Sequence, residues 1–149
     1  MLEILLVDDS HIDVQIMQEA LEGTRVLSRL HSAKDGVECM AFLRQEGQFK
    51  SAPRPGLILL DVHMPRKNGL DVLAEIKGDP AFRGIPTVML TSSREDRDVA
   101  RAYDLQANGY VQKPVDFDDF VAVMGGIEQF WTGVVRLPQP TVSQTPVVS

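Results

Sequence analysis

The chain has 149 residues, 44% of them apolar and 24% charged, with a formal net charge of -6 at pH 7. This length is enough for one domain with a substantial core. The negative charge argues against nucleic acid as a partner, because a basic face is needed to neutralise phosphates. The single cysteine, Cys39, excludes an internal disulfide. Since neither a membrane-length apolar segment nor a signal peptide is visible, we expect a cytoplasmic protein with no membrane partner.

Strand-like and helix-like patterns alternate along the chain. Apolar runs predict strands at residues 3–7, 26–31, 57–60, 86–90 and 109–112. Four helix start signals combine a capping residue with a carboxylate three positions later: Ser10 with Asp13, Asp35 with Glu38, Ser93 with Asp96, and Asp116 with Asp119. The Asn68-Gly69 turn precedes a further helix near residues 70–77. The pattern predicts an α/β fold, (βα)5, whose parallel sheet carries helices on both faces.

Apolar spacing indicates which parts of the chain are buried. One face of the first predicted helix is expected to pack into the core through Ile12, Ile16, Met17, Ala20 and Leu21. After Trp131 the composition changes to Pro, Ser, Thr and Gln. We therefore expect a folded domain at residues 1–131 and a Pro-rich C-terminal extension at residues 132–149, either an arm or a disordered tail.

Polar residues follow four of the predicted strands. Asp8 and Asp9 follow the first, Asp61 the third, Thr91 the fourth and Lys113 the fifth. Ligands of open α/β sheets bind at the carboxyl ends of the strands, so these side chains should share one crevice. Carboxylate oxygens suit a hard cation such as Mg2+, and a carboxylate beside a metal is competent as a phosphoryl-accepting nucleophile. The sequence therefore predicts a site for a divalent cation and a phosphoryl group.

Each of these residues also has an ordinary structural explanation when taken alone. An acidic pair such as Asp8 and Asp9 suits a helix N-terminus. Asp61 and Thr91 are of types that cap turns and helices. A single lysine such as Lys113 is usually solvated. The functional interpretation depends on the conjunction of all five.

Four segments, in this order, resemble the receiver domains of bacterial two-component response regulators: LLVDDS, LILLDVHMPRKNGLDVL, VMLTSS and YVQKPVD. The resemblance covers residues 2–131. It implies a flavodoxin-like, doubly wound sheet of five parallel strands in the order 2-1-3-4-5. It also implies a single-domain regulator that accepts a phosphoryl group from a sensor histidine kinase.

The resemblance implies roles for the acidic and basic site residues. Asp61 is the implied phosphoacceptor, and Lys113 is the implied phosphoryl-binding lysine. The implied site for Mg2+ or Mn2+ consists of Asp8, Asp9, Asp61 and the backbone carbonyl of His63.

The resemblance also implies a conformational switch. Its members are the hydroxyl of Thr91 and the aromatic ring of Tyr110, although Tyr110 also suits a half-buried strand position. The Lys113-Pro114 bond is expected to be cis. Ser92 stands where alanine is frequent in the family, which puts the packing of that loop in doubt.

Two other function classes are open to a chain with these residues. Phosphatases of the haloacid dehalogenase type carry an aspartate two residues after the nucleophile and a threonine two further on, but this chain has His63 and Pro65 there. The other class is a pseudo-receiver or flavodoxin-like module that only binds a partner or flavin. A flavin site would need a hydroxyl- and glycine-rich phosphate loop in place of Asp8-Asp9, and a phosphorylation-independent binder would normally lack part of the acidic set. We expect a phosphoacceptor signalling protein, not an enzyme, with intrinsic autophosphatase activity. The resemblance implies that His63 bears on that hydrolysis, because the side chain two residues after the phosphoacceptor lies near the path of an attacking water. His63 is either a general base there or an exposed histidine that only lends its carbonyl.

A narrower likeness concerns the kinase. The loop at residues 45–56, the stretch YDLQANGYVQKPVD, Phe130-Trp131 and the Leu-Pro tail are similar to stand-alone regulators that partner phytochrome-type histidine kinases. A kinase of this type is the partner that the resemblance implies.

Apolar residues on the last predicted helix exceed what one buried stripe requires: Phe117, Phe120, Val121, Met124, Ile127 and Trp131. Val134, Val135 and Leu137 extend this apolar character, and Gly125-Gly126 suggests close packing of another element. We expect a homodimer that uses the fourth helix, the fifth strand and the last helix, with residues 132–140 as an extended arm across the partner. The alternative is a monomer with a frayed tail.

Overall fold

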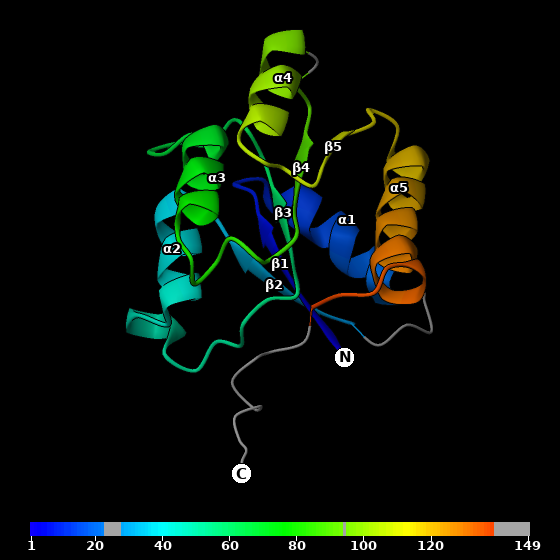
Figure 1. The fold of residues 1–149 in the computed structure, drawn as a ribbon. Coiled ribbons are helices and arrows are strands. Elements are labelled where there is room, and N and C mark those ends of the chain that lie inside the picture. Colours follow the sequence, from blue (N-terminus) through cyan, green and yellow to red (C-terminus); the bar gives the residue numbers. More distant parts are fainter. Residues whose placement is uncertain (23–27, 94, 139–149) are drawn as a thin grey trace.

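The computed structural model describes residues 1–22, 28–93 and 95–138, which form a five-stranded parallel sheet between two layers of helices (Figure 1). The strand order is β2-β1-β3-β4-β5, and every pairing is parallel. This confirms the predicted flavodoxin-like fold. The strands are β1 (Leu2–Val7), β2 (Ser28–Ala33), β3 (Leu57–Leu60), β4 (Thr87–Thr91) and β5 (Gly109–Gln112).

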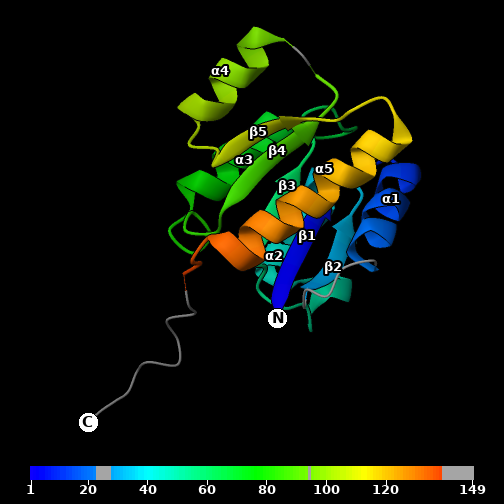
Figure 2. The same cartoon turned by 90° about the vertical axis from the view of Figure 1, so that its right-hand side faces the viewer.

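Helices cover both faces of the sheet, with α1 and α5 on one face and α2, α3 and α4 on the other (Figure 2). The α-helices are α1 (His11–Glu22), α2 (Gly36–Arg44), α3 (Gly69–Gly78), α4 (Asp96–Asp104) and α5 (Phe117–Gln129). A 3-10 turn, η1 (Gly47–Phe49), follows α2, and a π-helical turn, η2 (Phe130–Val134), follows α5. In the part of the chain that the structure describes, none of the helices has the length and apolar character needed to cross a membrane.

The sheet divides the apolar core in two, because neighbouring residues of a strand point to opposite faces. In β1, Leu5 and Val7 pack toward α2 and α3, whereas Ile4 and Leu6 pack toward α1 and α5. Strand β3 is buried along its whole length, as expected for a central strand of a parallel sheet. Helix α4 contributes only Ala102 to the buried core among the residues described.

The predicted apolar face of α1 is correct only in part. Ile16, Met17 and Ala20 are buried, and Leu21 is partly buried against the same core. Ile12 is 68% exposed, contrary to the prediction. It lies in the first turn of α1, and helical spacing gives the direction of a side chain but not how far along the helix the core extends.

Strand β2 ends later than the sequence predicted. The prediction covered residues 26–31, of which 26 and 27 lie outside the described residues. The observed strand continues to Ala33, because its parallel register with β1 pairs Leu2 with Ser28 and Val7 with Ala33. The ladder then extends into the next loop, where the Asp8 amide donates to the Ala33 carbonyl at 3.0 Å.

The helix start signals are confirmed for three helices. The side chains of Ser10, Asp35 and Asp116 each accept a hydrogen bond from the backbone amide three residues later. For α4 the prediction is wrong: its N-cap is Glu95 instead of Ser93. Ser93 instead donates its hydroxyl to Asp98 Oδ2 at 2.6 Å.

The segment after α5 turns back onto the same domain. Turn η2 crosses residue 131, where the sequence suggested that the domain ends, and the Val135 amide donates to the Phe130 carbonyl at 3.0 Å. Leu137 then lies beside Gly56, near the start of β1. The predicted arm therefore begins against its own chain, and its residues 139 and 140 lie outside the described residues.

Gly69 allows α3 to begin directly against the end of β3. A Cβ atom at this position would lie 1.8 Å from the carbonyl oxygen of Asp61 and 2.9 Å from Cα of Val62. Both contacts are with backbone, so a side chain here would force the end of β3 and the start of α3 apart. The Gly69 amide also donates to the Val62 carbonyl at 2.7 Å, which closes the intervening loop.

We predict that Gly69→Ala lowers the free energy of unfolding by about 1–3 kcal/mol, because the backbone must move to admit a methyl group. The matched control is Gly78→Ala in the last turn of α3, where an added Cβ meets nothing within 4 Å in the described structure. That change should raise stability by about 0.4–1 kcal/mol. Urea denaturation measures both, and a similar effect of the two substitutions would contradict the close approach at Gly69.

Candidate functional site

The carboxyl ends of β1, β3 and β5 bring one ammonium group and three carboxylates together. Lys113 Nζ lies 2.6 Å from Asp8 Oδ2, 3.2 Å from Asp61 Oδ2 and 2.7 Å from Asp13 Oδ2. Asp8 follows β1, Asp61 follows β3 and Lys113 follows β5, so the sheet itself sets these distances. The predicted convergence of Asp8, Asp61 and Lys113 at this edge is therefore observed.

Lys113 is a buried cation whose charge is maintained by its neighbours. Its side chain is only 8% exposed, and such burial by itself would lower the pKa of an ammonium group. The negative charges of Asp8 and Asp61, together with hydrogen bonds to Asp13 and Asp8, outweigh burial, so the pKa of Lys113 is raised. The site thus keeps a fixed positive charge at neutral pH.

Asp8 is the most buried carboxylate of the site. Burial raises the pKa of Asp8 to about 6, although the Lys113 ammonium and the hydrogen bond from the Ser10 amide both act in the opposite direction. That amide donates to Asp8 Oδ1 at 2.9 Å, which leaves Oδ2 for Lys113. The charge on Asp8 therefore depends on cations close to it.

Asp8, Asp9 and Asp61 form a group capable of holding a metal ion. Each offers a carboxylate oxygen, and these oxygens lie within 4.8 Å of one another. Asp8 and Asp61 are buried, whereas Asp9 is exposed. A hard cation such as Mg2+ or Mn2+ binds oxygen ligands of this type and usually retains several waters. Because Asp9 is exposed, water can reach the group from that side. The donor set fits a divalent cation.

Asp13 is a site residue that sequence reasoning missed. Its position three residues after Ser10 identified it only as part of a helix start signal. The Asp13 amide does donate to Ser10 Oγ at 3.2 Å, but the carboxylate faces Lys113. A signal was available in the sequence, because a residue in the first turn of α1 lies next to the loop that carries Asp8 and Asp9.

Thr91 and Tyr110 are connected through the backbone of Ser93. Thr91 is fully buried at the end of β4, and its Oγ1 accepts a hydrogen bond from the Ser93 amide at 3.3 Å. The half-buried Tyr110 donates its hydroxyl to the Ser93 carbonyl at 3.2 Å. Thr91 and Tyr110 thus both bond to the backbone of Ser93, in the loop between β4 and α4.

His63 links the loop after β3 to α4. Its side chain is 62% exposed, and its Nε2 lies 3.8 Å from Asp98 Oδ2. The His63 amide also approaches Asp61 Oδ1 at 3.4 Å, so the residue contacts both the acidic site and the helix. The role of its carbonyl as a metal ligand stays a prediction.

The Lys113-Pro114 bond is trans, contrary to the prediction, as are all other peptide bonds among the residues described. The trans isomer of an X-Pro bond is favoured by about 0.5–1 kcal/mol unless the surroundings select cis. With the trans bond, Lys113 still reaches all three carboxylates. The contacts of the ammonium therefore do not require the cis isomer.

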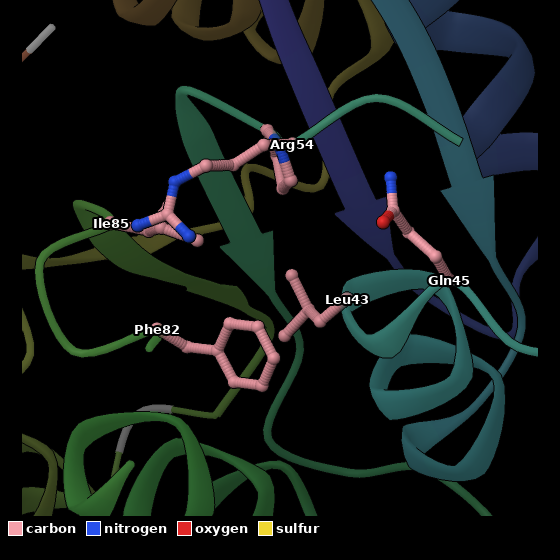
Figure 3. Close-up of a pocket in the computed structure, with 6 residues that line it drawn as sticks. Leu43, Gln45, Arg54, Phe82 and Ile85 are labelled. Atoms are coloured by element: carbon pink, nitrogen blue, oxygen red, sulfur yellow. The ribbon is translucent and has the colours of Figure 1, made fainter. Parts of the chain in front are cut away.

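A pocket at the opposite end of the sheet is separate from this chemistry (Figure 3). It has a volume of about 210 Å³ and is lined mainly by Leu43, Pro55, Phe82 and Ile85, with Arg54 and Gln45 at its side. Pro55 and Ile85 precede β3 and β4, whereas the acidic site follows β1 and β3. Arg54 already donates to the Ala81 carbonyl at 2.7 Å.

Comparison with known proteins agrees with this geometry. The response regulator receiver domain family matches residues 4–124. Response regulator Rcp1 of Synechocystis sp. is 44% identical over 135 residues, which cover 91% of this chain and 92% of Rcp1.

Two similar solved structures extend the likeness to three dimensions. The Mn2+-bound form of Rcp1 has a TM-score of 0.89 at 42% identity, and the match covers 93% of this chain and all of that one. The phosphorylated cyanobacterial phytochrome response regulator RcpA has a TM-score of 0.88 at 42% identity, over 92% of this chain and 98% of that one. These matches favour neither the phosphatase nor the flavin-binding alternative. With its parallel sheet and the acidic group beside Lys113, this chain belongs to the response regulator receiver domain family.

Proposed function

We propose that this protein is a single-domain response regulator that accepts a phosphoryl group on Asp61 from a phosphohistidine of a sensor kinase. The observation that carries the proposal is the position of Asp61, which lies 3.2 Å from the Lys113 ammonium and within 4.8 Å of Asp8 and Asp9. In the transfer, a carboxylate oxygen of Asp61 attacks phosphorus while the bond from phosphorus to the imidazole nitrogen breaks. The product is an acyl phosphate on Asp61.

The chain supplies orientation and charge for this transfer. Asp61 is 7% exposed and follows a fully buried strand, so its carboxylate has little freedom to move. Lys113 offers a preorganised positive charge to the phosphoryl oxygens, which gain negative charge as the bond to nitrogen breaks. Both groups are placed by backbone elements before any donor binds.

Asp8, Asp9, Asp61 and the carbonyl of His63 would hold Mg2+ or Mn2+. The ion, when bound, offsets the negative charge of the carboxylates and of the incoming phosphoryl group. The carboxylate cluster supports this assignment, as does the Mn2+-bound form of the similar protein Rcp1.

We propose a phytochrome-type histidine kinase as the donor and the cytoplasm as the compartment of the transfer. The similar protein RcpA, described as a phosphorylated cyanobacterial phytochrome response regulator, supports this choice of donor. Exposed apolar side chains near the site also suit a protein partner: Ile12 is 68% exposed and Val115 is 94% exposed. They come from the first turn of α1 and the loop after β5, which adjoin Asp13 and Lys113.

Signalling would follow from a change in the contacts of Thr91 and Tyr110. A phosphoryl group on Asp61 provides a stronger acceptor for the Thr91 hydroxyl than the neutral groups around it. Movement of Thr91 would alter the hydrogen bond from the Ser93 amide, and Ser93 also accepts from Tyr110. Intrinsic hydrolysis would end the signal, and the exposed His63, whose amide lies 3.4 Å from Asp61 Oδ1, is proposed to influence its rate.

A homodimer through α4, β5 and α5 completes the proposal. Phe117 and Tyr103 are exposed on these helices, and Phe130 is exposed just beyond α5. An added Cβ at Gly125 or Gly126 would meet nothing within 4 Å in the described structure, so that surface of α5 has room for a partner. The predicted arm, residues 132–140, stays part of this proposal, although its first residues form a helical turn and Leu137 lies against its own chain.

Asp61→Asn is predicted to abolish phosphorylation, because the amide nitrogen and oxygen lack the charge and nucleophilicity of the carboxylate. Radiolabelling would be measured with acetyl phosphate and with an autophosphorylated phytochrome-type kinase. Asp71→Asn, which changes an exposed carboxylate in the first turn of α3, is the matched control and should label normally. Full labelling of Asp61→Asn would refute the phosphoacceptor assignment.

Removal of divalent metal by EDTA is predicted to stop labelling by acetyl phosphate, and excess Mg2+ or Mn2+ should restore it. Asp9→Ala should weaken metal binding, because Asp9 contributes one of the three clustered carboxylates. Titration of the protein with Mn2+ would measure the affinity. Transfer that proceeds at an unchanged rate in EDTA would show that the acidic cluster has another role.

Truncation after Trp131 is predicted to weaken self-association, because it removes the proposed arm. Sedimentation velocity at tens of micromolar would compare the full chain with the truncated one, with and without a phosphoryl analogue such as beryllofluoride. A fully monomeric full chain under both conditions would refute the dimer. Equal association of the two chains would confine the interface to the helices.

A further inference from the structure

Lys113 contacts three carboxylates, and one of them, Asp13, is not in the group of carboxylates that could hold a metal ion. The ammonium lies within 3.2 Å of Asp8, Asp13 and Asp61, and an ammonium group has three N–H donors. Asp8 and Asp61 also belong, with Asp9, to the described group that could hold a cation, whereas Asp13 does not. Asp8 and Asp61 are therefore candidate metal ligands that also contact Lys113, whereas Asp13 contacts Lys113 alone of these two partners.

A divalent cation and the Lys113 ammonium would compete for the same two carboxylates, those of Asp8 and Asp61. Lys113 contacts Oδ2 of Asp8 and Oδ2 of Asp61, and both carboxylates would be drawn to a bound cation. Two positive groups sharing buried carboxylates also repel each other in a medium that screens charge poorly. Binding of the cation therefore requires that the ammonium give up part of its contact with these two residues.

We propose that Asp13 is a positioning residue that retains the Lys113 ammonium when a divalent cation takes up Asp8 and Asp61. This inference rests on the proposed function, because it assumes that the acidic cluster binds the cation used in phosphoryl transfer. Asp13 keeps the Lys113 ammonium beside Asp61, on which the phosphoryl group is proposed to form. Asp13 acts through Lys113 and touches neither the cation nor the phosphoryl group.

The position of Asp13 suits this role because it is fixed independently of Lys113. Asp13 lies in the first turn of α1, where its amide donates to Ser10 Oγ, and its backbone is therefore held by the helix cap. Its side chain is 20% exposed, so its ion pair with Lys113 is less screened than a pair on the open surface.

Mn2+ titration of the unphosphorylated full chain, followed by the paramagnetic relaxation of water protons, tests the inference in a double-mutant cycle. The variants are Asp13→Asn, Lys113→Gln and the double substitution. Asp13→Asn should weaken Mn2+ binding roughly three- to tenfold while Lys113 is present, because the ammonium then relies on Asp8 and Asp61. In the Lys113→Gln background most of this loss should disappear.

The cycle separates this role from a general effect of charge. If Asp13 acts only as a nearby negative charge, Asp13→Asn weakens Mn2+ binding equally in both backgrounds, and the proposal is overturned. An unchanged affinity in the presence of Lys113 overturns it as well. Glu19→Gln, an exposed position farther along α1, is the matched control for loss of one negative charge and should leave the affinity unchanged.

A second measurement covers the case in which Asp13→Asn perturbs the fold. The NMR signal of the Lys113 ammonium protons, observed in the unchanged chain with saturating Mg2+, should persist because Asp13 still accepts from them. Its disappearance on Mg2+ addition would overturn the proposal. Acetyl phosphate labelling of the unchanged chain is the separate test of the proposed function, since neither titration nor NMR involves phosphoryl transfer.

Discussion

The cluster formed by the Lys113 ammonium with Asp8, Asp13 and Asp61 is the interaction on which the rest of the site depends. Several carboxylates gathered in a buried place repel one another and lose hydration, and each effect disfavours their charged forms. A single buried cation offsets this cost and joins the ends of β1, β3 and β5 with the start of α1. Loss of the Lys113 ammonium would leave three neighbouring carboxylates with uncompensated charge, so the cluster depends on this one cation.

The fold was predictable because local and long-range signals agree. Strand β3 (Leu57–Leu60) and strand β5 (Gly109–Gln112) coincide with the predicted residues 57–60 and 109–112, since apolar runs between turn signals have few alternatives. The end of β2 was less predictable, because its pairing with β1 sets its length. Position 12 was misjudged for a related reason: the helical period gives a direction, but not the edge at which the core ends.

The candidate site was predicted in its members at strand ends, and less well in their surroundings. Topology alone places Asp8, Asp61 and Lys113 at one edge of the sheet. The Asp13 carboxylate accepts a hydrogen bond from Lys113. A capping pattern does not reveal this contact, because it identifies Asp13 only as a residue at the start of a helix. Likewise Ser93 bonds to Asp98 and leaves the cap of α4 to Glu95. Which of several neighbouring polar groups a side chain bonds to depends on the tertiary structure.

The shallow attachment of α4 has a consequence for how the domain responds to change. Ala102 is its only buried residue among those described, and the hydrogen bond from Ser93 to Asp98 holds its first turn near the site. Displacing this helix would uncover little apolar surface, so the free energy needed to shift it is small compared with that for α5. The sheet and its acidic edge can therefore stay rigid while one helix adopts a second position, which confines the mechanical compliance of the domain to a single face.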